Sequence, residues 1–169
     1  LEALQNSAFA AGLPALGASA ATKLAQAEGK PLPDLPPLPG PLGDLTFDQA
    51  VAVDLSRLLL SFGRFGETIA ALEGIDHPST RNNLGLARFA QGEIAAALAG
   101  FEATWRQDMR NLFALHQVVR LRLWTGGCGP AGELADVLQD TQPLRAEDAY
   151  GKMFGLLLHL FLQAGALDG

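Results

Sequence analysis

Histidine and cysteine are the side chains of this sequence that most readily do chemistry, and there are few of them. The histidines are His77, His116 and His159, and Cys128 is the single cysteine. No histidine has a carboxylate or a second histidine at the spacing of a metal site. The sequence also lacks the H-E-x-x-H, G-x-S-x-G and P-loop patterns. We therefore predict no metal, no cofactor and no enzyme activity.

Cys128 lies in the segment "GGCGP", just before an expected helix start, where a thiolate is favoured. A nucleophile is one interpretation, but an inert cysteine in a glycine-rich turn between helices explains the segment better. Gly126, Gly127 and Gly129 do not make a phosphate loop, because no Lys-Ser/Thr pair follows them. A single cysteine forms no internal disulfide, which slightly favours the cytoplasm over the periplasm.

Charge is unevenly distributed along the 169 residues, whose net charge is −6. Residues 1–78 carry −5 and residues 126–169 carry −4, whereas residues 79–125 carry +3. An acidic chain is not typical of a nucleic-acid-binding protein. The longest apolar run, residues 153–167, is shorter than the ~20 residues of a membrane helix. We therefore expect no nucleic-acid partner and no membrane insertion, and we interpret the run as a buried helix.

Glycine, proline and capping residues divide the sequence into helices, and no segment shows the alternation of a strand. Thr46 and Gln49 have the spacing of a capping box and begin a helix that ends near Gly63. Ser79 is the predicted cap of another helix. The predicted helices are Leu1–Ala11, Ala18–Glu28, the helix from Thr46 to Gly63, Glu67–Leu72, Ser79–Gln91, Glu93–Arg106, Asn111–Thr125, one beginning at Pro130, and Glu147–Ala164.

Six prolines between Pro31 and Pro41 interrupt the helical pattern. They favour an extended, polyproline-like path, because proline has a fixed φ and no amide donor. Leu32, Leu35 and Leu38 recur at the three-residue period of that conformation. We expect this edge to dock on the helices. We call residues 31–45 the Pro-rich strap; it separates short N-terminal helices (1–30) from a helical domain (46–169).

The spacing of small residues within residues 78–145 is regular. Gly92 and Gly126 are 34 residues apart, and Leu84-Gly85, Ala97 and Phe101 flank the first of them. Two helices approach closely where a small residue faces the partner. In this pattern the chain resembles the tetratricopeptide repeat (TPR) family, whose period is 34 residues. The best repeats are 78–111 and 112–145. In the second of them, Gly126, Ala131 and Pro143 fall at the turn glycine, the small residue and the closing proline.

The resemblance implies an all-α fold of antiparallel helical hairpins, stacked as a short TPR-like α-solenoid. It also implies a concave groove, lined by the first helix of each repeat, that binds a protein or peptide. We expect an acidic partner, because residues 79–125 are basic. Carried over to this sequence, the groove positions are Asn82, Leu86, Phe89, His116, Arg120 and Trp124.

Two other functions stay open. The chain could be a structural or assembly subunit whose groove its own strap fills. It could also be a helical accessory domain of a larger enzyme. We expect the interaction protein to be one module of a longer chain. We further expect Arg81 and Arg88 to pair with Glu93 or Glu102.

Overall fold

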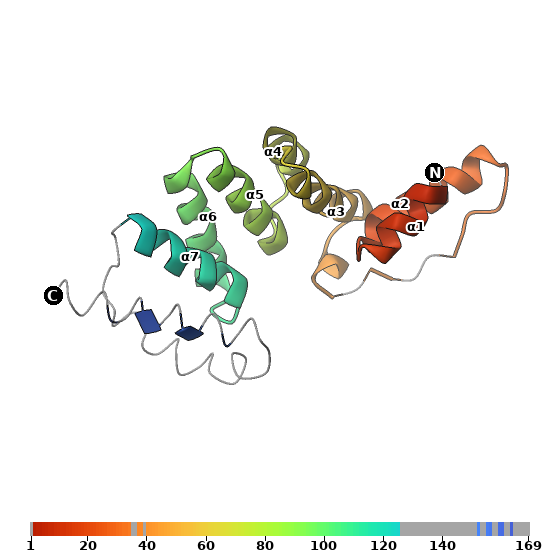
Figure 1. Ribbon diagram of the computed structural model, residues 1–169. Coiled ribbons are helices and arrows are strands. Elements are labelled where there is room, and N and C mark those ends of the chain that lie inside the picture. Colours follow the sequence, from red (N-terminus) through yellow and green to blue (C-terminus); the bar gives the residue numbers. More distant parts are fainter. Residues whose placement is uncertain are drawn as a thin grey trace. The chain divides into compact units, whose positions relative to one another are not determined.

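The computed structural model describes residues 2–34, 37–38 and 40–125, together with the positions 152, 155–156, 159–160 and 163 (Figure 1). The described residues form helices and connecting turns and contain no strand, which confirms the all-α prediction. The chain divides into two compact units, residues 1–87 and 88–169, with the division inside α5. The helices are α1 (Glu2–Ala10), α2 (Pro14–Ala27), α3 (Phe47–Ser61), α4 (Phe65–Leu72), α5 (Pro78–Ala90), α6 (Ile94–Gln107) and α7 (Leu112–Thr125), with a 3₁₀ helix, η1 (Gly40–Asp44), before α3.

Three helix-to-helix turns share one local structure, centred on Gly12, Gly63 and Gly92. Each glycine has a positive φ, between 69° and 82°, which favours glycine because it has no Cβ. In all three turns the amide after the glycine donates to the carbonyl five residues earlier, with an N–O distance of 2.9 Å. The pairs α1–α2, α3–α4 and α5–α6 therefore have the same type of connection, and α1–α2 is a hairpin that the sequence did not reveal as one.

A small residue follows each of these glycines by five positions. The three residues are Gly17, Thr68 and Ala97, and all are buried. At Gly17 the reason is direct, because a Cβ there would lie 3.0 Å from the ring of Phe9 on α1. Small side chains at this position let the second helix of a hairpin pack closely against the first.

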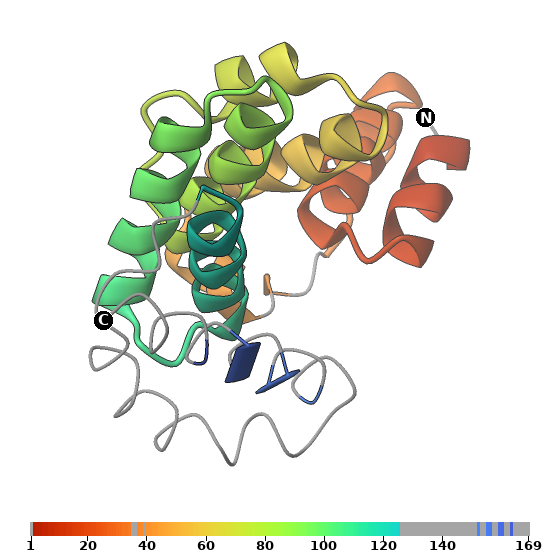
Figure 2. The ribbon, with the colours of Figure 1, turned by 60° about the vertical axis from the view of Figure 1, so that its left-hand side comes forward.

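The first unit has its core between α2, α3 and α4. Ala15, Leu42, Ala50, Val53 and Leu72 form one buried cluster. Figure 2 shows α1 and α2 (red) side by side, and they pack on each other as α2 packs on α3 and α3 on α4. The core therefore joins the N-terminal hairpin to the helices that follow the strap.

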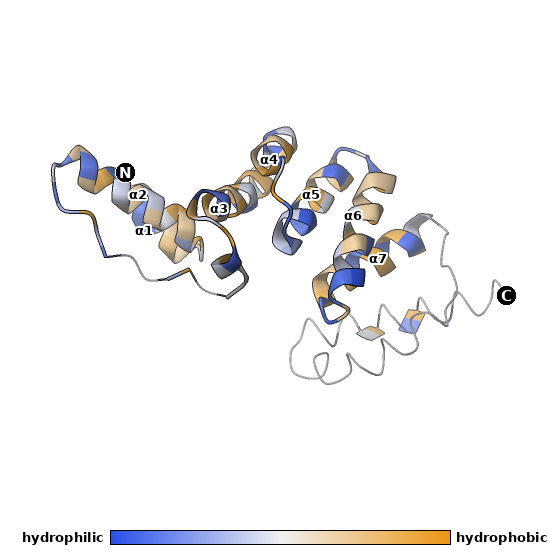
Figure 3. Cartoon of the chain, turned by 180° about the vertical axis from the view of Figure 1, so that it is seen from behind, coloured by the Kyte–Doolittle hydropathy of each residue, from blue (hydrophilic) through white to orange (hydrophobic). Residues whose placement is uncertain are grey.

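The second unit is built on the contact between α6 and α7. Phe101 is fully buried, and its ring meets that of Phe113 edge to face, with the centroids 6.3 Å apart. Trp105 is also buried on α6. Hydrophilic and hydrophobic residues both occur around α7 (Figure 3), and six of its positions are buried. Such a helix is enclosed on more than one side.

The helix ends partly confirm the predicted caps. At Thr46 both hydrogen bonds of the capping box are present, as predicted. α2 begins at Pro14, four residues before the predicted start, because proline suits the first helical turn. The prediction that Ser79 caps α5 was wrong. That helix begins at Pro78, and the Ser79 amide donates to Nδ1 of His77 over 3.2 Å.

The Pro-rich strap docks through its end and not along its whole edge. Leu32 is 62% exposed, which contradicts the predicted apolar edge at that position, and Leu35 lies outside the described residues. Leu38 packs against the core of the first unit, and Leu42 is buried in it. Leu42 belongs to η1, the 3₁₀ helix that begins at Gly40 and Pro41. The sequence had predicted a fully extended path for Pro41, so the prediction is wrong at this end of the strap.

The predictions for residues 126–151, including Cys128 and the helix at Pro130, lie outside the described residues. Within the predicted helix Glu147–Ala164, the six described positions are helical. Leu156, His159 and Leu160 are exposed, so the prediction of a buried helix is wrong at these positions. None of the helices in the described ranges combines the length and hydrophobicity that crossing a bilayer requires.

Candidate functional site

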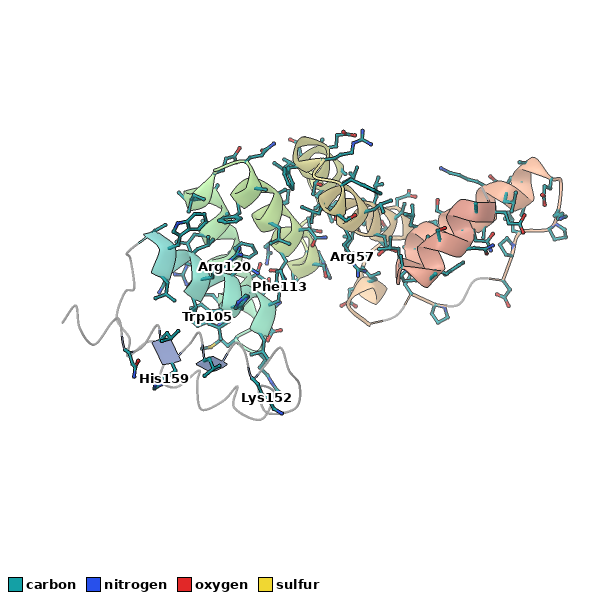
Figure 4. The ribbon with its side chains drawn as sticks, viewed as in Figure 1. Arg57, Trp105, Phe113, Arg120, Lys152 and His159 are labelled. Atoms are coloured by element: carbon teal, nitrogen blue, oxygen red, sulfur yellow. The ribbon has the colours of Figure 1, made fainter. Side chains whose placement is uncertain are left out.

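An aromatic and cationic cluster forms on α7 and the last turn of α5. The rings of Phe89 and Trp124 meet edge to face, with centroids 5.2 Å apart and planes at 65°. The Arg120 guanidinium carbon lies 4.7 Å from the centroid of the Phe89 ring, which is a cation–π contact. We call these three residues the Phe–Arg–Trp cluster. It lies entirely in the second unit, and Figure 4 locates Arg120.

Helical spacing accounts for the arrangement. His116, Arg120 and Trp124 follow one another at four-residue intervals, so they lie on one stripe of α7. Phe89 lies near the end of α5, just before the Gly92 turn. The structure therefore brings three of the six predicted groove residues into direct contact.

The exposed parts of the cluster are suited to recognition. Trp124 is 66% exposed although it is a large aromatic residue. Arg120 is partly buried, and its Nε has no hydrogen-bond partner in the part of the chain that the structure describes. A buried donor without an acceptor is uncommon, because desolvating it costs free energy. The cluster thus joins an exposed aromatic ring to a partly buried guanidinium.

His116 adds a titratable group to the same stripe. Burial lowers the pKa of its imidazole, and the positive charge of Arg120 lowers it further. The imidazole is therefore neutral at pH 7. Its neutrality limits the positive charge of the stripe to that of Arg120.

The remaining groove residues, Asn82 and Leu86, lie in the first unit. They are partly buried, and their spacing places them on the same face of α5 as Phe89. The Asn82 Oδ1 is buried without a hydrogen-bond partner among the described residues. Both residues are thus placed on α5, and neither belongs to the Phe–Arg–Trp cluster as defined by its ring contacts.

Sequence reasoning missed an ion pair between α6 and α7. Glu102 on α6 accepts from Nε and Nη2 of Arg122 on α7, at 3.0 and 2.6 Å. It also accepts from Arg106, at 3.2 Å. Within the first unit, Arg81 pairs with Asp76, since its Nε donates to the Asp76 carboxylate over 2.9 Å. The basic character of residues 79–125 is therefore partly neutralised, while Arg120 is engaged by an aromatic ring.

Metal chemistry finds no support in the described residues, where no group of three or more His, Cys, Asp or Glu side chains could hold an ion. Comparison of the chain with protein-family models, with curated proteins and with solved structures finds no match. The function must therefore be inferred from the geometry of the chain itself.

Protonation of His116 gives a testable pH dependence of stability. The folded protein holds this pKa below the ordinary value of 6.5, so the unfolded chain binds a proton that the folded chain does not. The free energy of unfolding should fall as pH drops below 6.5, by at most about 1.4 kcal/mol per pH unit for one proton. Above pH 6.5, His116 is neutral in both the folded and the unfolded chain, and its contribution to the free energy of unfolding no longer changes with pH.

Urea denaturation between pH 5 and 8 measures this dependence. The variant His116→Gln is the control, because it keeps a polar side chain and removes the titration. Subtracting its pH profile isolates the contribution of His116. A difference profile that is flat, or that rises as pH falls, would contradict the lowered pKa.

Proposed function

We propose that this chain is a protein-interaction module that binds a protein or peptide through a surface centred on the Phe–Arg–Trp cluster. The observation that carries the proposal is the exposed Trp124 ring in one cluster with the Arg120 guanidinium, since both contact Phe89. Tryptophan and arginine are the residue types that contribute most to binding at interfaces. An exposed tryptophan and a partly buried arginine that both contact Phe89 are best explained by recognition of a partner.

The chemistry of the cluster suits a carboxylate beside an apolar side chain. The planar guanidinium of Arg120 lies over Phe89 and can offer its donors to a carboxylate oxygen. Trp124 offers an apolar ring that packs against the same Phe89. Residues 79–125 carry a net charge of +3, which attracts an acidic segment toward this part of the chain.

The repeated hairpin turns support a TPR-like α-solenoid as the framework for this surface. The same connection occurs at Gly12, Gly63 and Gly92, each followed by a small buried residue. Helical-hairpin repeats present the faces of their first helices as an extended binding surface. In this arrangement α5 and α7 are first helices, and they carry all six predicted groove residues.

A structural subunit with a self-occupied groove is the alternative. It requires Leu32, Leu35 and Leu38 to be protected by the helices. The 62% exposure of Leu32 disfavours this alternative, and Leu38 packs against the core of the first unit. We therefore favour an interaction module.

Selection of random 12-residue peptides on the immobilised full chain tests the proposal. We expect enrichment of peptides that place Asp or Glu beside an apolar residue. Arg120→Ala should weaken their binding more than tenfold, about 1.4 kcal/mol, and binding to the parent chain should weaken as salt rises. Affinities are measured by fluorescence anisotropy with labelled peptides.

Arg110→Ala is the matched control, because Arg110 is an exposed arginine of the same unit. It should change the affinity less than twofold. Circular dichroism establishes that both variants are folded. Equal affinity of the parent and a folded Arg120→Ala variant, at low and high salt, would reject the cluster as the binding surface.

A further inference from the structure

Two side chains of α3 hold the turn that joins α1 to α2. The Asp54 Oδ2 accepts from the backbone amides of Ala15 and Leu16, at 2.7 and 3.1 Å. One helical turn later, Nη1 of Arg57 donates to the carbonyl of Gly12 over 3.1 Å. The carboxylate of Asp54 thus satisfies amides at the start of α2, which its own N-cap residue, Leu13, cannot do with its side chain. We call Asp54 and Arg57 the turn clamp; Figure 4 locates Arg57 on α3.

The α5–α6 hairpin has a polar residue at the position equivalent to Asp54, and its side chain also bonds to the preceding hairpin. Asp54 lies nine residues before the turn glycine Gly63, and Asn83 lies nine residues before Gly92. The Asn83 Nδ2 donates to the Ser56 hydroxyl of α3 over 2.8 Å. In both hairpins, a polar side chain at this position on the first helix bonds to the preceding hairpin. The clamp therefore belongs to a repeated way of joining one hairpin to the next.

The apolar contact between α2 and α3 is made by small side chains. Its central buried residues are Ala15 on α2 and Ala50 and Val53 on α3. Hydrophobic stabilisation scales with the apolar area removed from water, and an alanine side chain is a single methyl group. The contact consequently depends on the polar clamp more than a leucine-rich interface would.

The clamp itself is incompletely satisfied. The Asp54 side chain has no exposed surface, and burial raises the pKa of its carboxyl against the opposing effects of the two amides and of Arg57. Its Oδ1 has no hydrogen-bond partner among the described residues, and the nearest cationic nitrogen, Nη1 of Arg57, is 3.8 Å away. Burying a carboxylate costs free energy that such partial pairing offsets only in part. The turn clamp therefore fixes where the α1–α2 hairpin docks on α3, but it adds little net free energy to the docking.

We propose that the α1–α2 hairpin is a separately opening element of the first unit, and that the turn clamp selects its closed position. The opening separates α2 from α3 while α3, α4 and the first part of α5 stay folded. The chain from Glu28 to Thr46 keeps the open hairpin tethered, so closing is intramolecular and reversible. Opening uncovers Ala50, Val53 and Asp54 on α3, which gives the module a conformational switch at its N-terminal end.

Amide hydrogen exchange of the full chain tests the proposal, under conditions in which the opening equilibrium limits exchange. Asp54→Ala leaves the amides of Ala15 and Leu16 without an acceptor. We expect α2 amides to exchange more than tenfold faster than in the parent, while those of α4 change less than twofold. Asp54→Asn keeps an acceptor oxygen, so its effect on α2 should be smaller than that of alanine.

Asp48→Ala is the matched control, because it removes an exposed carboxylate from the same helix. It should leave the ratio of α2 to α4 exchange unchanged. Equal acceleration in α2 and α4 by Asp54→Ala would show that Asp54 stabilises the unit as a whole, and no acceleration would show that docking does not need it. Either result overturns the proposal. If Asp54→Ala does not fold, Arg57→Ala decides, since it removes the exposed half of the clamp and should accelerate α2 alone.

Discussion

Replacing Phe101 with alanine is expected to reduce the free energy of unfolding by about 3–5 kcal/mol. Phe101 has no exposed surface, and its ring packs edge to face on that of Phe113 at a centroid distance of 6.3 Å. The substitution removes the apolar contact and leaves a cavity between α6 and α7, which the helices can only partly fill. Urea denaturation followed by circular dichroism gives the free energy.

Phe62 provides the matched control for this prediction. It is 72% exposed at the end of α3, so Phe62→Ala should change the stability by about 0.5 kcal/mol or less. A loss below 1 kcal/mol for Phe101→Ala would contradict the packing of α6 on α7. Comparable losses for the two variants would contradict the difference in their burial.

The helices that the sequence predicted best are those with strong local signals. Thr46 and Gln49 form the predicted capping box, and Gly63 and Gly92 end helices with a positive φ. These features depend on residues only a few positions apart, so the local sequence determines them. The predicted boundaries of α3, α6 and α7 accordingly agree with the structure to within one or two residues.

The N-terminal hairpin was harder to predict because its signal is weak. Alanine and glycine dominate α2, and their small side chains give little amphipathic contrast. The buried carboxylate that holds the hairpin comes from Asp54, almost forty residues further along the chain. Neither local propensity nor helical periodicity reveals such a contact.

Only the part of the candidate site that lies on a single helix could be predicted from the sequence. His116, Arg120 and Trp124 are on one helix, and a four-residue spacing is enough to align them. The contacts of Arg120 and Trp124 with Phe89 join different helices, and only the fold brings them together. The sequence indicated which residues share a helical face but not that they form one cluster.

The ion pair between Glu102 and Arg122 is the clearest contact of this long-range kind, and it supports the second large prediction. The two side chains are 17% and 12% exposed, and one carboxylate oxygen accepts two hydrogen bonds from the guanidinium. Arg106 shares the carboxylate but is 67% exposed, so its contribution is screened by water. Removing the charge of Glu102 leaves the less exposed guanidinium of Arg122 without its charged acceptor.

We expect Glu102→Gln to lower the free energy of unfolding by about 1–3 kcal/mol, because hydrogen bonds to charged groups are worth more than neutral ones. Glu67→Gln is the matched control. Glu67 pairs with Arg64, but both side chains are 56% exposed, and an exposed pair contributes about 0–1 kcal/mol. Because burial weakens screening, the loss for Glu102→Gln should persist in 1 M salt, whereas any loss for Glu67→Gln should vanish there. Equal losses for the two variants at low salt, or a loss for Glu102→Gln that salt abolishes, would mean that α6 and α7 do not bury this pair.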